Sequence, residues 1–223
     1  MRLGRLITAT LLAVLCVAFL GSASLAAMEV KMSYNGPADV ENNAVHLYAI
    51  NFKRFVEEGT GGAVTIKLFP DSQLGNEEER MELLVKQGMN QSIINVASFA
   101  GVAPVFPEIY ASAVPFMFDS YDAAHIFFDE SRYWNRAKEE FRQRTGAYLL
   151  EAVEEGGFLA FTNDKRQIRT AEDFKGLRFR GMDEGQVILF ESFGASGTPI
   201  PWTELYMALK SGVVDGQMNP AMY

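Results

Sequence analysis

The chain has 223 residues, of which 48% are hydrophobic, and its formal net charge is −8 at pH 7. The apolar share is sufficient for a sizeable core, and the acidic balance argues against nucleic acid and anionic membrane surfaces as partners. The only cysteine is Cys16, which lies in the leader described below. The rest of the chain therefore has no disulfide, no thiolate metal site and no catalytic cysteine.

Residues 1–27 have the pattern of a secretory signal peptide. Arg2 and Arg5 precede an apolar run, which small residues follow at cleavage spacing. The run is shorter than the roughly 20 residues that a membrane-spanning helix needs. We therefore predict cleavage near Ala26-Ala27, export, and a mature chain that is not embedded in a membrane. Removal of this leader takes away Arg2 and Arg5, so the net charge of the mature chain is −8 − 2 = −10.

Strand and helix patterns alternate after the leader. The expected elements of the first half are a strand over 30–34, a helix over 43–58, a strand over 64–68, a helix from the capping box of Asn76 and Glu79 to Gly88, a strand over 92–97, and one or two helices over 122–145. We interpret the acidic run at positions 77–79 as a solvated face that the helix dipole favours.

The same alternation continues in the second half. The expected elements are a strand over 147–154, a strand over 158–162, a short helix over 170–176, a strand ending at Arg180, helices over 184–193 and 203–210, and a strand from Val213. This order predicts an α/β fold with parallel sheets, whose ligands bind at the carboxyl ends of strands. The pair Gly156-Gly157 is placed where a crossover between two lobes would lie.

Arg180 is the foremost binding candidate. Strand alternation places Leu177 and Phe179 on one face and both Arg178 and Arg180 on the other. A guanidinium at the end of a strand offers a planar fork of donors that matches a carboxylate. The competing interpretation is that both arginines are solvated charges at a sheet edge, as most arginines are.

The other candidates are weaker. Asn219 precedes a proline and Asn35 follows the first strand, so each is also an ordinary turn residue. Trp202 precedes the expected helix cap Thr203, where it either staples the core or forms one wall of a cleft.

Catalytic patterns are lacking in the sequence. His46 and His125 are the only histidines, and they are too far apart in sequence to form a ligand pair. No nucleophile elbow and no phosphate-binding glycine loop occurs. We expect no catalytic residue, no metal and no cofactor, although a carboxylate pair of the glycoside-hydrolase kind stays open.

Five runs together resemble, in order and spacing, the solute-binding subunits of tripartite ATP-independent periplasmic (TRAP) transporters of the dicarboxylate-binding DctP type. They are Phe69-Pro-Asp-Ser-Gln-Leu-Gly75, Val114-Pro-Phe-Met-Phe118, Asp173-Phe-Lys-Gly-Leu-Arg-Phe-Arg180, Pro199-Ile-Pro-Trp-Thr-Glu-Leu-Tyr206 and Gly212-Val-Val-Asp-Gly-Gln-Met-Asn-Pro220.

The resemblance implies a two-lobed fold like that of periplasmic binding proteins, with a central cleft. Lobe I would cover residues 28–155, and lobe II residues 156–223, truncated before its return crossover. Arg180 would occupy the position of the family's carboxylate-binding arginine. The family's other ligand-facing positions fall on or near four residues: Asn219, Trp202, Asn35 and Asp183.

The function implied is a periplasmic receptor, not an enzyme, that captures a small organic acid and delivers it to a TRAP membrane permease. Many relatives carry a second arginine in the strand after the crossover, where residues 158–161 have none. We therefore expect a monocarboxylate, with Phe99, Phe158 and Trp202 packing on its body. Two alternatives remain: an exported hydrolase that uses a carboxylate pair, and a receptor that feeds a sensor protein.

Overall fold

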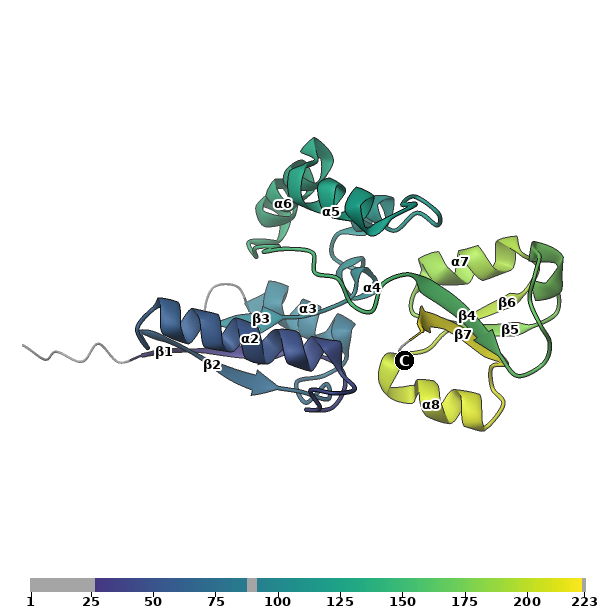
Figure 1. The fold of residues 1–223 in the computed structure, drawn as a ribbon, viewed down its shortest axis with the longest axis horizontal. Coiled ribbons are helices and arrows are strands. Elements are labelled where there is room, and N and C mark those ends of the chain that lie inside the picture. Colours follow the sequence, from purple (N-terminus) through teal and green to yellow (C-terminus); the bar gives the residue numbers. More distant parts are fainter. Residues whose placement is uncertain (1–26, 88–91, 222–223) are drawn as a thin grey trace, which may run out of the picture.

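The computed structural model describes residues 27–87 and 92–221, and these residues form two α/β lobes (Figure 1). The predicted leader and its Cys16 lie outside the described residues, apart from Ala27. Within the described ranges, no helix has both the length and the apolar composition needed to cross a membrane.

The first lobe contains a parallel sheet in the order β2-β1-β3, in which Val30 lies opposite Ile66 and Lys31 opposite Ile93. Its elements are β1 (Met28–Ser33), α2 (Ala44–Gly59), β2 (Val64–Phe69), α3 (Glu77–Gln87), β3 (Ile93–Asn95), α4 (Phe99–Val102), the 3-10 helix η2 (Pro107–Ser112), α5 (Tyr121–Glu130) and α6 (Arg132–Thr145).

Side-chain caps determine where the first two helices begin. Asn43 accepts a hydrogen bond from the Val45 backbone N–H at 3.1 Å, while its own amide donates to the Pro37 carbonyl at 2.7 Å. The predicted capping box before α3 is confirmed, because the Asn76 and Glu79 side chains each accept from the other's backbone N–H at 2.9 and 2.8 Å. These caps orient the loops that follow β1 and β2.

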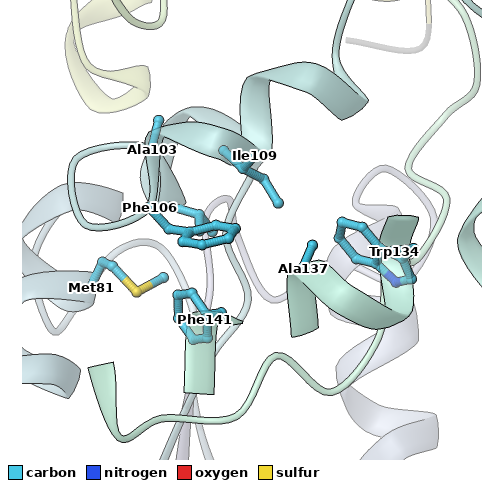
Figure 2. Close-up of a cluster of buried hydrophobic side chains, with 8 residues drawn as sticks. Met81, Ala103, Phe106, Ile109, Trp134, Ala137 and Phe141 are labelled. Carbon is cyan, nitrogen blue, oxygen red and sulfur yellow. The ribbon is translucent and has the colours of Figure 1, made fainter. Parts of the chain in front are cut away.

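A hydrophobic core in the first lobe holds α6 against α3, α4 and η2 (Figure 2). Phe106 and Phe141 meet edge to face with ring centroids 5.7 Å apart, and Trp134 is fully buried beside Ala137. Met81 of α3 belongs to the same cluster. Since α3 also carries Glu77 and Arg80, this packing secures the helix that faces the second lobe.

The second lobe contains a mixed sheet in the order β4-β7-β5-β6. Its elements are β4 (Leu159–Asn163), the 3-10 helix η3 (Ala171–Phe174), β5 (Arg178–Gly181), α7 (Glu184–Ser192), β6 (Ser196–Pro199), α8 (Trp202–Lys210) and β7 (Gly216–Pro220). Its core is aromatic, with Phe179 stacked on Phe190 at a centroid distance of 4.7 Å.

Two predictions for the second half are wrong. Residues 147–154 are in no strand, although Ala147, Leu149 and Ala152 pack on the first lobe's core while Tyr148 is exposed. Buried and exposed side chains do alternate along this segment, but within the described ranges no neighbouring strand pairs with it. The second sheet is not wholly parallel either, because β4 runs antiparallel to β7.

Other differences are local. The strand β6 was not predicted from its sequence, Ser-Gly-Thr-Pro, which lacks apolar alternation. The cap of α8 is Pro201 rather than Thr203, and β7 begins at Gly216 rather than at Val213. The predicted boundary between residues 155 and 156 falls in the segment that joins the lobes, and it stays a prediction.

Candidate functional site

A cleft of about 230 Å³ lies between the two lobes. The first lobe contributes the residues after β1 and β2 and the start of α3, and the second lobe contributes the ends of β5 and β6 and the start of α8. The lining residues are Asn35, Ser72, Asn76, Glu77, Glu78, Ala100, Gly101, Arg180, Met182, Pro199, Ile200, Pro201, Trp202 and Thr203. The carboxyl ends of parallel strands thus meet at this cleft, as the α/β pattern predicts.

Arg180 lies at the end of β5 and is buried, with 1% of its surface exposed. Its Nε donates to the Ile200 carbonyl at 2.7 Å, whereas the buried Nη1 has no partner. Burial lowers the pKa of Arg180 to about 10, and the charges of Glu77 and Asp183 oppose this fall. The side chain is therefore charged at neutral pH, with a donor left for an anion.

Arg178, on the same face of β5, has a different role. It forms a bidentate pair with Asp215, with Nη2–Oδ1 and Nε–Oδ2 distances of 2.6 and 3.1 Å. This pair lowers the pKa of Asp215 to about 2. Arg178 is half exposed, as expected for a sheet-edge charge, and its pair joins β5 to the turn before β7.

Asn35 faces the cleft from the turn after β1, and two donors fix its amide. Arg80 Nη2 and Ser72 Oγ donate to Asn35 Oδ1 at 2.8 and 3.0 Å. Because an arginine has donors only, the atom beside Arg80 must be the amide oxygen. The Asn35 Nδ2 is left as a donor, and it has no hydrogen-bond acceptor among the described residues.

Glu77 is the first residue of α3 and provides an acidic wall to the cleft. Its Oε1 accepts from the Ser98 backbone N–H at 2.8 Å and its Oε2 from the Ser98 hydroxyl at 2.7 Å. The prediction of a solvated face is therefore wrong for Glu77, which is half-buried, while Glu78 and Glu79 are exposed.

Trp202 also lines the cleft, from the first turn of α8. Asn219 and Asp183 do not line it. Asn219 is buried in β7, where its amide donates to the Gln217 side chain. Asp183 caps α7 by accepting from the Gln186 N–H at 2.8 Å.

Asp183 also connects the lobes through Tyr110 of η2. Burial, together with the charge of Asp183 and a hydrogen bond to it, raises the pKa of Tyr110 to about 12. The Tyr110 ring packs on Gly185, where an added Cβ would lie only 2.9 Å from Cε1. This contact ties the start of α7 to the first lobe.

Two aromatic residues expected at the ligand lie elsewhere. Phe99 packs in the first lobe against Phe128, and Phe158 is half exposed beside Tyr121. Phe99 is the first residue of α4, and its ring faces the core that α6 completes. The sequence places it near the cleft but does not show this orientation.

The histidines lie outside the cleft lining. His46 Nδ1 is hydrogen-bonded to the Tyr34 hydroxyl at 2.6 Å. His125 has a carboxylate partner that its sequence neighbours do not reveal, Glu154, at 3.0 Å on the surface. Over the described ranges, no group of three or more histidine, cysteine or acidic side chains could hold a metal ion.

Sequence reasoning missed Arg80, Ser72 and Glu77. Arg80 is 2% exposed, and an arginine in an acidic helix ordinarily points to solvent. No local pattern marks Arg80 or Glu77, because the groups that bond them lie far away in the sequence.

The family described as bacterial extracellular solute-binding protein, family 7 (DctP) matches residues 37–223. Among curated proteins, the 2,3-diketo-L-gulonate-binding periplasmic protein of Escherichia coli is 29% identical over 205 residues, covering 92% of this chain and 60% of the relative. The chain therefore spans about 60% of that relative's length.

Solved structures give the same result. A TRAP periplasmic solute-binding protein from Sulfurospirillum deleyianum with bound succinate is 28% identical, with a TM-score of 0.75 over 86% of this chain and 60% of its own. One from a Polaromonas species bound to D-erythronate is 30% identical, with a TM-score of 0.75 over 86% and 61%. These relatives are named as binding proteins, and the two solved structures share the fold of this chain over 86% of its length.

Proposed function

Because the chain belongs to the family 7 bacterial extracellular solute-binding proteins, we propose that it is a periplasmic receptor for a small organic acid. The acid binds in the cleft, held by Arg180, and is handed to a TRAP membrane permease. The relatives' succinate, D-erythronate and diketogulonate suggest the size of the ligand. No step of this function changes the ligand covalently.

The unpartnered Nη1 of Arg180 carries the proposal. Leaving a charged donor buried and unpaired is costly, and a ligand carboxylate would remove that cost by a bidentate pair. The Nε bond to the Ile200 carbonyl fixes the plane of the fork, so little rotational freedom is lost on binding. The cleft is thus prepared for one carboxylate.

A monocarboxylate fits the charges better than a dicarboxylate. Residues 158–161 contribute no arginine, and the other buried arginine, Arg80, is already bonded to Asn35 and Ser33. The wall opposite Arg180 carries Glu77 and Glu78, which would repel a second carboxylate.

Hinge closure would couple binding to delivery. The ligand would bridge Arg180 of one lobe and Asn35 of the other, and the Tyr110–Asp183 contact would add to the closed state. Opening at the permease would then expose the carboxylate to water and weaken its pair with arginine. Asn219 and Asp183 stay candidates for ligand contact in that closed form.

A thermal-shift screen of the mature gene product against organic acids tests the function, followed by calorimetry and mass spectrometry of the recovered ligand. We expect stabilisation by at least one monocarboxylate and intact recovery of the ligand. No response to any acid, or conversion of the ligand, would contradict the receptor assignment, and conversion would favour the hydrolase alternative.

A further inference from the structure

Two residues on the first-lobe wall of the cleft offer a donor and an acceptor, Asn35 and Glu77. The donor is Asn35 Nδ2, whose orientation is set by Arg80 and Ser72 at Oδ1. The acceptor is the Glu77 carboxylate, which Ser98 binds once at each oxygen. A carboxylate has about four lone-pair sites, so Glu77 retains acceptor capacity toward the cleft.

We propose that Glu77 and Asn35 form a hydroxyl-binding pair, so that the protein selects acids carrying a hydroxyl group on the end remote from the carboxylate. This inference rests on the proposed function and deepens it. A hydroxyl donates one hydrogen bond and accepts others, so it satisfies Glu77 and Asn35 together.

The other polar groups of similar size fit this wall less well. A second carboxylate can accept from Asn35 but faces the charge of Glu77. An ammonium group can donate to Glu77 but places its hydrogens against the Asn35 donor, because it has no acceptor. A methyl group leaves the Asn35 Nδ2 donor and the remaining acceptor sites of Glu77 without partners.

Arg80 acts in this scheme as a positioning residue. It is buried beneath the cleft wall and bonds Asn35 Oδ1 at 2.8 Å and, more weakly, Ser33 Oγ at 3.3 Å. Without a donor at this position, the Asn35 amide could turn its oxygen toward the cleft. The wall would then present two acceptors and lose its donor.

Calorimetry with four acids of equal chain length tests the proposal: γ-hydroxybutyrate, succinate, γ-aminobutyrate and butyrate. We expect the wild-type gene product to bind the hydroxy acid at least 10-fold more tightly than each of the others. Glu77→Gln removes the charge but keeps the shape, and it should reduce the hydroxy-acid preference over succinate by about 10-fold. Glu82→Gln is the matched control, because Glu82 lies on the same helix, pairs with Lys86 and does not line the cleft.

The role of Arg80 has its own pair of variants. Arg80→Lys keeps a donor beside Asn35 and should retain the preference for the hydroxy acid, whereas Arg80→Met should reduce it at least 5-fold. A purely structural role would lower affinity for all four acids equally and leave the ratio unchanged.

Each outcome separates this inference from the function on which it rests. Binding of none of the acids tested, in this series or in the wider screen, would contradict the receptor function and the hydroxyl pair together. A wild-type preference for succinate, γ-aminobutyrate or butyrate would overturn the hydroxyl pair alone, even if Glu77→Gln failed to fold. An unchanged ratio in a folded Glu77→Gln protein would overturn it as well.

Discussion

Replacement of Arg180 by alanine tests the binding site most directly. The guanidinium is 1% exposed, so the pair with a ligand carboxylate forms away from water. Each charge-assisted hydrogen bond contributes about 1.5–3 kcal/mol, so two give about 3–6 kcal/mol. Arg180→Ala should therefore weaken binding by roughly 10²–10⁴-fold, enough to remove measurable binding of a micromolar ligand.

Lysine at the same position separates charge from shape. Arg180→Lys retains a cation but loses the planar fork, so about half of the interaction should remain. The expected loss of affinity is roughly 10–100-fold. Both variants also remove the Nε bond to the Ile200 carbonyl, so the melting temperature of each ligand-free protein is recorded first.

Isothermal titration calorimetry with the best acid from the screen measures the effect, well below the melting temperature. Arg178→Ala is the matched control, since it removes the same charge from the same strand but does not line the cleft. Its affinity should stay within about 2-fold of wild type, because it does not touch the ligand. Equal affinity in wild type and Arg180→Ala would refute the site.

Three further predictions concern other contacts. The Arg178–Asp215 pair lowers the pKa of Asp215 from 3.8 to about 2, so its stabilisation is complete above about pH 5 and is lost as the pH falls from 4 to 2. Because Arg178 is half exposed, Asp215→Asn should lower the free energy of unfolding by only about 1–2 kcal/mol at pH 7. The variant should also lose less stability than wild type between about pH 4 and 2, which urea unfolding at several pH values would measure. Tyr110→Phe removes the hydroxyl that interacts with Asp183 and should weaken ligand binding roughly 3–10-fold by making closure less favourable. An unchanged ligand dissociation rate in stopped-flow traces would argue against this. Trp202→Ala should reduce affinity about 10-fold by removing the apolar cleft wall, with equal affinity counting against that contact.

Local patterns predicted most elements but not their pairing. The capping box before α3 depends on neighbours in sequence, and the structure confirms it. Residues 147–154 show the limit of such patterns. Their alternation records burial on one side, but only a neighbouring strand makes an extended segment part of a sheet.

The same distinction applies to the site. Arg180, Asn35 and Trp202 were singled out from their places at a strand end or a helix start, and the resemblance raised all three as ligand-facing positions. Arg80 and Glu77 could not be identified in this way, because their roles depend on partners from 16 to 47 positions away in the chain.

The amino-acid sequence by itself determined the α/β class and the family, and it marked Arg180 as the foremost binding candidate, since each follows from short runs of residues. Tertiary structure alone decided which of two arginines on β5 is buried, since Arg178 meets Asp215 while Arg180 meets Ile200. It also decided that Asn35 presents a donor and Glu77 an acceptor. The physical reason is that a polar side chain's direction depends on the groups that bond it, and folding brings these together from distant parts of the chain.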